Sequence, residues 1–224
     1  MENLAIIPAR GGSKRIPHKN ITPFLGKPLI AYSIERAIQS DLFSEVMVST
    51  DDERIAEISR EFGAIVPFFR SKKNSDDYAT LADVIHEVID TYRNRKTKFQ
   101  HVCCILATSP LLTYHNLNKG YNLLLSGKYN TVRPVVRFDY PIQRAYTMNK
   151  GKVDFMYPEY QKTRSQDLEP AFHDAGQFYW MYFDKGMAKS NKGGFEISSM
   201  EVQDIDNNED LKLAELKYTL LNSI

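Results

Sequence analysis

Cysteine is scarce in this chain of 224 residues, which has only Cys103 and Cys104. Small secreted domains that depend on disulfides carry many more cysteines, so that class is excluded. The two cysteines are neighbours in an apolar run, where successive side chains of a strand point to opposite faces. We therefore expect neither a disulfide between them nor a metal-thiolate site.

The chain also lacks an excess of charge and a long apolar run. It has 29 lysines and arginines against 28 aspartates and glutamates, so its formal net charge of +1 gives no global field to hold nucleic acid or an anionic membrane. No apolar run reaches the roughly 18 residues of a spanning helix, and the first residues lack a basic signal-like start. We expect a cytoplasmic protein that binds neither nucleic acid nor membrane.

What the sequence does contain is typical of a globular protein. Hydrophobic residues make up 42% and aromatic residues 12% of the chain, which is enough to build a full core. The length favours one compact domain, residues 1–224, with a small appended element. In a chain of nearly neutral net charge, an anionic ligand needs a local cluster of cations.

Strands and helices alternate along most of the chain. The apolar run at residues 4–8 is typical of a strand buried on both faces, and we expect it at the centre of the sheet. Apolar residues at helical spacing, with capping residues and closing glycines, predict the helices. The predicted strands are 4–8, 45–50, 65–69, 101–107, 176–183 and 195–202, and the predicted helices are 28–43, 53–62, 81–92, 113–125 and 207–221. This pattern favours a three-layer α/β fold around a mostly parallel sheet, with ligands beyond the carboxyl ends of the strands.

The helical period is lost between residues 131 and 160. Turn signals at Asp139-Tyr140-Pro141 and Asn149-Lys150-Gly151 separate short apolar segments, which is typical of hairpins. We therefore predict an inserted β element over residues 131–175.

A basic loop follows the first predicted strand. Its four cations, unaccompanied by any acid, are Arg10, Lys14, Arg15 and Lys19. The Gly11-Gly12 pair lets backbone N–H groups approach a phosphate, so the loop favours a di- or triphosphate. Its spacing matches neither a Walker A loop nor a dinucleotide fingerprint, which counts against kinases, ATPases and dehydrogenases. The alternative is a solvated basic loop.

An acidic pair precedes the last predicted helix, in Gln203-Asp204-Ile205-Asp206. Two carboxylates separated by one residue point to the same side of an extended segment, where each can give an oxygen to Mg²⁺. The alternative for Asp206 is that it caps the helix.

The basic loop and the acidic pair belong to a set of segments that extends along nearly the whole chain. The set is Ala9-Arg10-Gly11-Gly12-Ser13-Lys14-Arg15-Ile16-Pro17-His18-Lys19-Asn20, Gly26-Lys27-Pro28-Leu29-Ile30, Val48-Ser49-Thr50-Asp51, Thr108-Ser109-Pro110 and Asp204-Ile205-Asp206. It resembles the cytidylyltransferases that activate nonulosonic acids, the CMP-sialic acid synthetase family. The resemblance implies a Rossmann-like nucleotidyltransferase (GT-A-like) fold, CTP and a nonulosonic acid as substrates, Mg²⁺ as cofactor, and a homodimer whose inserted β element reaches the partner's site.

Two further segments indicate a branch of that family. Arg164-Ser165-Gln166-Asp167-Leu168 and His173-Asp174-Ala175-Gly176-Gln177-Phe178-Tyr179-Trp180 resemble the pseudaminic acid branch. The sialic branch has Leu-Gln-Pro-Thr-Ser-Pro at residues 105–110 and Arg-Pro-Asn-Gly at residues 173–176, and this chain has neither. We therefore expect CMP transfer from CTP to the anomeric hydroxyl of pseudaminic acid.

The resemblance also implies a role for each site residue. Arg10, Lys14 and Lys19 would be catalytic; Ala9, Arg10, Gly11, Gly12, Ser13, Lys14, Asn20, Arg70 and Asp76 would bind the nucleotide; Asn20, Arg164, Gln177 and Tyr179 would bind the sugar; and Asp204 and Asp206 would bind the metal. Arg70 would read cytosine, since an arginine presents donors only and suits the acceptors O2 and N3. The alternative for Arg70 is an exposed surface arginine. Arg164 would act from the neighbouring subunit.

Three other functions remain open from the sequence. The acceptor can be legionaminic, sialic or deoxyoctulosonic acid instead. A glycosyltransferase can use Asp204-Ile205-Asp206 as its metal motif, although the basic loop would then have no role. A regulatory module would bind the nucleotide without turnover.

Overall fold

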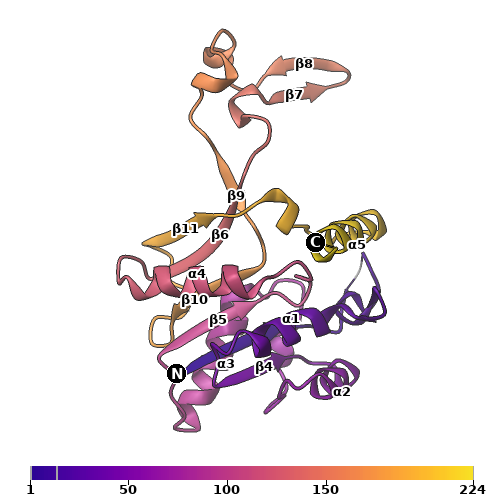
Figure 1. The fold of residues 1–224 in the computed structure, drawn as a ribbon, viewed down its shortest axis with the longest axis vertical. Coiled ribbons are helices and arrows are strands. Elements are labelled where there is room, and N and C mark those ends of the chain that lie inside the picture. Colours follow the sequence, from indigo (N-terminus) through magenta and orange to yellow (C-terminus); the bar gives the residue numbers. More distant parts are fainter. Residues whose placement is uncertain (1, 14, 224) are drawn as a thin grey trace.

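The computed structural model describes residues 2–13 and 15–223, so the predicted site residue Lys14 lies outside the described part. Its centre is a seven-stranded sheet in the order β11-β6-β10-β5-β1-β4, with β9 paired to the far part of β6 (Figure 1). The strands of this sheet are β1 (Asn3–Pro8), β4 (Glu45–Ser49), β5 (His101–Ile105), β6 (Thr131–Arg137), β9 (Phe172–Asp174), β10 (Phe178–Tyr182) and β11 (Lys192–Glu196). Only β9 and β10 run antiparallel to their neighbours in this part of the chain, which confirms the mostly parallel sheet.

Helices cover both faces of the sheet and make the three layers. The helices are α1 (Leu29–Gln39), α2 (Glu53–Glu61), α3 (Leu81–Asn94), α4 (Tyr114–Leu125) and α5 (Asn208–Asn222). Helices α1, α2 and α4 share one apolar core with one face of the sheet, and α3 packs on the opposite face. Within the described residues, no helix is long and apolar enough to cross a membrane.

The burial of β1 follows from its sequence. Ala5 and Ile7 belong to the core on the α1 side, while Leu4 and Ile6 belong to the core on the α3 side. The same alternation in β5 buries both Cys103 and Cys104, and burial raises the pKa of each thiol well above its ordinary value. Both cysteines are free thiols in the core, and their burial makes them unreactive.

Three details of the predicted sheet are wrong. Strand β1 lies between β4 and β5, one position from the β4 edge and not at the centre. Of the predicted strand 65–69, only Ile65 makes a bridge, to Met47, because Pro67 has no N–H to continue the ladder. The predicted strand 195–202 ends at Glu196, and a short 3-10 helix, Ser199–Glu201, follows with Ser198 as its capping residue.

The inserted element begins later than predicted. Strand β6 pairs with β10 on one side and with β11 on the other, so residues 131–137 belong to the central sheet. The chain then leaves the sheet over residues 138–171, which we call the arm, and returns through β9. Figure 1 shows the arm projecting from the body with the hairpin β7 (Tyr146–Asn149) and β8 (Lys152–Phe155) near its end. The turn of this hairpin, Asn149-Lys150-Gly151, is where the sequence predicts it.

Two smaller elements hold the basic loop. The two-residue strands β2 (Pro23–Phe24) and β3 (Lys27–Pro28) form a hairpin between the loop and α1. A third apolar core connects this region to α5. It contains Ile205, which lies shortly before α5 and is fully buried. The first and last parts of the chain therefore meet next to the basic loop.

Candidate functional site

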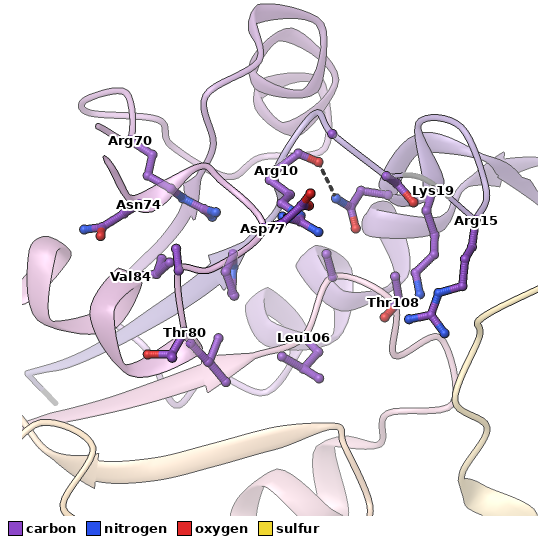
Figure 2. A pocket seen from close by; sticks show the side chains of 17 residues that line it. Arg10, Arg15, Lys19, Arg70, Asn74, Asp77, Thr80, Val84, Leu106 and Thr108 are labelled. Carbon is purple, nitrogen blue, oxygen red and sulfur yellow. Dashed lines mark hydrogen bonds and ion pairs between the residues drawn. The ribbon is translucent and has the colours of Figure 1, made fainter. Parts of the chain in front are cut away.

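A cavity of about 560 Å³ lies at the carboxyl ends of the parallel strands, as the fold predicts. Its walls come from the loop after β1, from residues 70–84 and from residues 106–108 after β5. Figure 2 shows Arg70 at one end of this cavity, Arg15 and Lys19 at the other, and Arg10 between them. Cationic side chains therefore line the cavity along its length.

Arg10 is held from two sides. Its Nη1 donates to the carbonyl of Asp76 at 2.8 Å and pairs with the Asp77 carboxylate at 3.0 Å. The Asn20 side chain donates to the carbonyl of Arg10 at 3.0 Å (Figure 2). These contacts fix both the backbone and the guanidinium of Arg10, and both Arg10 and Asn20 line the cavity.

Lys19 and Arg15 contact the acidic pair. Lys19 donates to the carbonyl of Ile205, and its Nζ lies 3.4 Å from the Asp206 carboxylate. Arg15 also pairs with Asp206, although its side chain is 70% exposed. The two segments that the sequence singled out separately are thus in direct contact.

The two glycines of the loop have different surroundings. The N–H of Gly11 donates to Asp51 at 3.0 Å, and a Cβ at Gly11 would lie 2.6 Å from the carboxylate of Asp52, the capping residue of α2. Gly12 has open space around it and lines the cavity beside Ser13. Gly11 is therefore required by packing against α2, whereas Gly12 leaves room for a ligand.

Arg70 is a buried cavity residue and not the exposed surface arginine of the alternative. Its residue exposure is 8%. Its Nε donates to the Ser49 hydroxyl at 3.1 Å, and its Nη2 donates to the Ser49 carbonyl. Burial lowers the pKa of Arg70, while the charges of Asp51 and Glu87 oppose this effect. Within the described chain no ion pair uses its remaining N–H groups, which are thus available to a ligand.

The wall opposite the basic loop was not predicted as part of the site. It consists of Asn74, Asp77, Ala79, Thr80, Leu81 and Val84, around the start of α3. Thr80 and Asp83 form a capping box at the start of α3. Such a motif marks where a helix starts, but it does not indicate that this end of the helix faces a cavity.

A second cavity of about 410 Å³ adjoins the first, and Leu106 lines both. Residues 173–176 line this second cavity, which is where the sequence departs from the sialic branch. Asp204 and Lys217 complete its charged lining together with Asp174. Lys217 donates to the carbonyls of Ser199 at 3.0 Å and Val202 at 2.6 Å, so it fixes the segment that leads to Asp204.

The acidic pair lies between the two cavities. Asp204 lines the second, and Asp206 contacts the cations of the first, with buried Ile205 between them. Asp206 does not cap α5, because Asn207 accepts from the N–H groups of the first turn. Among the described residues, no group of three or more histidine, cysteine, aspartate or glutamate side chains could hold a metal alone. A metal bound here would need further ligands from substrate and water.

The remaining predicted residues lie outside the lining of these two cavities. Ala9 is buried behind the loop; Gln177 is buried and donates to the carbonyl of Glu201 at 2.6 Å; and the Asp76 carboxylate accepts from the N–H groups of Tyr78 and Ala79. Tyr179 donates to Asp174 at 3.2 Å beneath the second cavity. Arg164 is in the arm, 74% exposed and paired with Asp167 of its own chain.

Comparison with known proteins identifies relatives over nearly the whole chain. The cytidylyltransferase family model matches residues 4–223. A pseudaminic acid cytidylyltransferase of Campylobacter jejuni is 44% identical, with 97% of each chain covered. A Helicobacter pylori protein, named pseudaminic acid cytidylyltransferase and UDP-2,4-diacetamido-2,4,6-trideoxy-beta-L-altropyranose hydrolase, is 33% identical over 92% of this chain and 40% of its own length.

Solved structures show the same fold at low sequence identity. A CMP:2-keto-3-deoxy-manno-octonic acid synthetase complexed with CTP has a TM-score of 0.71 and 17% identity, with both chains fully covered. This likeness establishes the Rossmann-like fold of the chain.

The cationic lining predicts binding of a polyphosphate. Arg10→Ala should weaken binding of inorganic triphosphate by about 10- to 100-fold, since it removes charge-assisted hydrogen bonds from the middle of the cavity. Isothermal titration calorimetry measures the affinity. Arg60→Ala is the matched control, because Arg60 pairs with Glu53 on the surface of α2, away from the cavity. If the two variants bound inorganic triphosphate with equal affinity, the basic loop would not be a phosphate-binding site but a solvated basic surface.

Proposed function

This chain belongs to the cytidylyltransferase family, and we propose that it transfers CMP from CTP to the anomeric hydroxyl of pseudaminic acid. The observation that carries the proposal is the polarity of the first cavity. One end holds a buried arginine with free donors, and the other end holds the cations of the basic loop (Figure 2). A nucleoside triphosphate has the same polarity, with a base at one end and phosphates at the other.

The base end suits cytosine. Ser49 fixes two nitrogens of Arg70, and the remaining N–H groups can donate to O2 and N3 of the base. Uracil carries an N–H at N3, which would face a donor. Leu81 and Val84 supply an apolar wall for the ring. Arg70 therefore selects CTP over UTP.

The phosphate end suits transfer at the α-phosphorus. The hydroxyl oxygen of the acceptor forms a bond to the α-phosphorus, the bond to the bridging oxygen of pyrophosphate breaks, and the hydroxyl proton is released. Such a transfer requires positioning and neutralisation of charge more than covalent chemistry. Arg10 and Lys19, already held by Asp77 and Asp206, orient the phosphates and stabilise the charge that builds on them. Gly12 and Ser13 offer backbone and hydroxyl donors.

The second cavity is the place for the acceptor acid. It joins the nucleotide cavity at Leu106 and contains residues 173–176. A relative 44% identical over 97% of both chains is a pseudaminic acid cytidylyltransferase, which favours this acid over legionaminic, sialic and deoxyoctulosonic acids. Asp174 is held by Arg133 at 2.8 Å and by the N–H of Gly176, so the position of this carboxylate in the lining is fixed.

Asp204 and Asp206 would hold Mg²⁺ during the reaction. Their chemistry fits this ion, because two carboxylates beside a triphosphate leave the remaining positions to phosphate oxygens and water. Bound Mg²⁺ would neutralise charge on the phosphates. Asp206 is balanced by Arg15 and Lys19 in the structure, and these cations can turn to the phosphates when the nucleotide binds.

The arm would dimerise the chain. Of the 21 large apolar side chains that are exposed among the described residues, eight lie in the arm and a ninth, Phe172, lies at the start of β9. They are Phe138, Tyr140, Ile142, Tyr146, Met148, Val153, Met156, Tyr160 and Phe172. Such a concentration marks an interaction surface. Arg164 lines neither of the two cavities of its own chain, which favours a role at the acceptor site of a second copy of the chain.

A pyrophosphate-release assay tests the proposed reaction. With CTP and Mg²⁺, pseudaminic acid should give the fastest release among pseudaminic, legionaminic, sialic and deoxyoctulosonic acids. Replacing CTP by UTP should lower the rate by on the order of 100-fold, because Arg70 would face an N–H of the base. Release with another acid alone would change the substrate, and CTP binding without any release would indicate a regulatory module.

Loss of either metal ligand should abolish most turnover. Asp204→Asn and Asp206→Asn should each lower the rate at least about 100-fold, since each weakens neutralisation of the phosphates. Thermal unfolding should be little changed, because Asn207 and not Asp206 caps α5. Glu209→Gln, an exposed carboxylate on the first turn of α5, is the matched control. A folded, fully active Asp204→Asn, Asp206→Asn double variant would disprove the metal assignment.

Mixed dimers test whether the arm completes the partner's site. Arg164→Ala and Asp204→Asn subunits, each nearly inactive alone, should recover activity after subunit exchange, because a mixed dimer has one site with both groups intact. Random pairing makes roughly half of the dimers mixed, so recovery should approach about a quarter of the wild-type rate. Sedimentation as a monomer at micromolar concentration, or no recovery after verified exchange, would place Arg164 outside the shared site.

A further inference from the structure

The loop that follows Arg70 is held by a carboxylate outside the cavity lining. Glu87 lies on the second turn of α3. Its Oε1 accepts from the backbone N–H of Ser71 at 2.7 Å, and its Oε2 accepts from the Ser71 hydroxyl at 2.8 Å and from the side-chain amide of Asn74. One carboxylate thus receives three donors from a four-residue stretch, next to the proposed base-reading arginine.

Besides Glu87, a long hydrogen bond from the side-chain amide of Asn74 to the carbonyl of Asp83, at 3.5 Å, connects this loop to α3. Residues 71–73 are exposed, and the short 3-10 helix Lys72–Asn74 contains no buried side chain. The hydroxyl of Ser75 donates to the carbonyl of Ser71 at 2.8 Å, which is a bond within the loop. Without an apolar anchor, the position of the loop on α3 depends mainly on Glu87.

The charge of Glu87 also bears on Arg70. Burial acts to raise the pKa of Glu87, but hydrogen bonds from Ser71 and Asn74 and the charge of Arg70 hold it below its ordinary value. Glu87 is therefore a carboxylate at neutral pH. Its negative charge favours the charged form of Arg70 without forming an ion pair with it. The donors of Arg70 therefore stay available to the cavity.

We propose that Glu87 is a positioning residue for recognition of the nucleobase, acting through the loop 71–74 on Arg70. This inference rests on the proposed function, in which Arg70 reads cytosine. Glu87 then determines the affinity for CTP and the preference for CTP over UTP. It affects neither the transfer step nor binding of the acceptor, because the basic loop and the second cavity are formed by other segments.

Glutamine cannot replace Glu87 in this role. A carboxylate accepts at both oxygens, whereas a glutamine side chain has one acceptor oxygen and an NH₂ group. In Glu87→Gln the NH₂ group faces either the backbone N–H of Ser71, which cannot accept, or the Ser71 hydroxyl and the Asn74 amide, which donate to Glu87 and would have to reverse that role. At least one of the three hydrogen bonds is lost while the side chain keeps its size.

Calorimetry and steady-state kinetics on the full chain test the proposal. Glu87→Gln should raise Kd and KM for CTP by about 10-fold and lower the CTP-over-UTP preference similarly, while kcat and KM for the acid stay within about twofold. Ser71→Ala should act in the same direction by about threefold, because it removes one bond of the set. The control is Asp90→Asn, one turn further along α3, whose carboxylate pairs with Arg93 and not with the loop.

A double-mutant cycle shows whether Glu87 acts through Arg70. Once Arg70→Ala has removed the base-reading group, adding Glu87→Gln should weaken CTP binding by less than about twofold. Additive losses, or a Glu87→Gln variant with wild-type affinity and preference, would overturn the proposal. If Glu87→Gln does not fold, an unchanged CTP-over-UTP preference in Ser71→Ala overturns it. A wild-type chain that bound neither nucleotide would contradict the proposed function instead.

Discussion

The parallel pairing of β1 with both β4 and β5 is the constraint on which the site depends. Because parallel strands end at the same edge, the loop after β1 meets the segments that follow β4 and β5. Leu4, Ala5, Ile6 and Ile7 are completely buried, so both faces of β1 are covered by apolar residues and neither faces solvent. This burial fixes the position of β1 between its two neighbours. Arg10, Arg70 and Leu106 thereby line one cavity although they are far apart in sequence.

The charges around this cavity are balanced unequally. Arg10 has Asp77, and Lys19 and Arg15 have Asp206, so part of the basic loop is neutralised within the chain. Arg70 has only carbonyl and hydroxyl partners among the described residues, with the charge of Glu87 behind its loop. The cavity is therefore held together without a ligand but keeps donors for one, which is what a site for an anionic nucleotide requires.

The arm differs from the body in what covers its apolar side chains. In the body, apolar residues of β1, β5 and the helices fill two cores on the faces of the sheet. In the arm, residues such as Tyr140 and Met148 are exposed, at 85% and 77%, and the hairpin β7–β8 projects away from the sheet (Figure 1). An isolated two-stranded hairpin is marginally stable in water, and the proposed dimer would supply a surface for this one to pack against.

The sequence by itself determined the α/β class, the buried strands β1 and β5, the caps of α2 and α3, and the chemistry of the basic loop and the acidic pair. These features follow from local spacing and side-chain type. Only the tertiary structure decided that β6 belongs to the sheet, that Arg70 is buried beside Ser49, and that Asp206 contacts Lys19. These three features depend on contacts between segments that are distant in the sequence. The alternating pattern of residues 131–137, for example, does not show which strands β6 will pair with. Lys19 and Asp206 are separated by 187 residues, and the shared core around Ile205 is what brings them together.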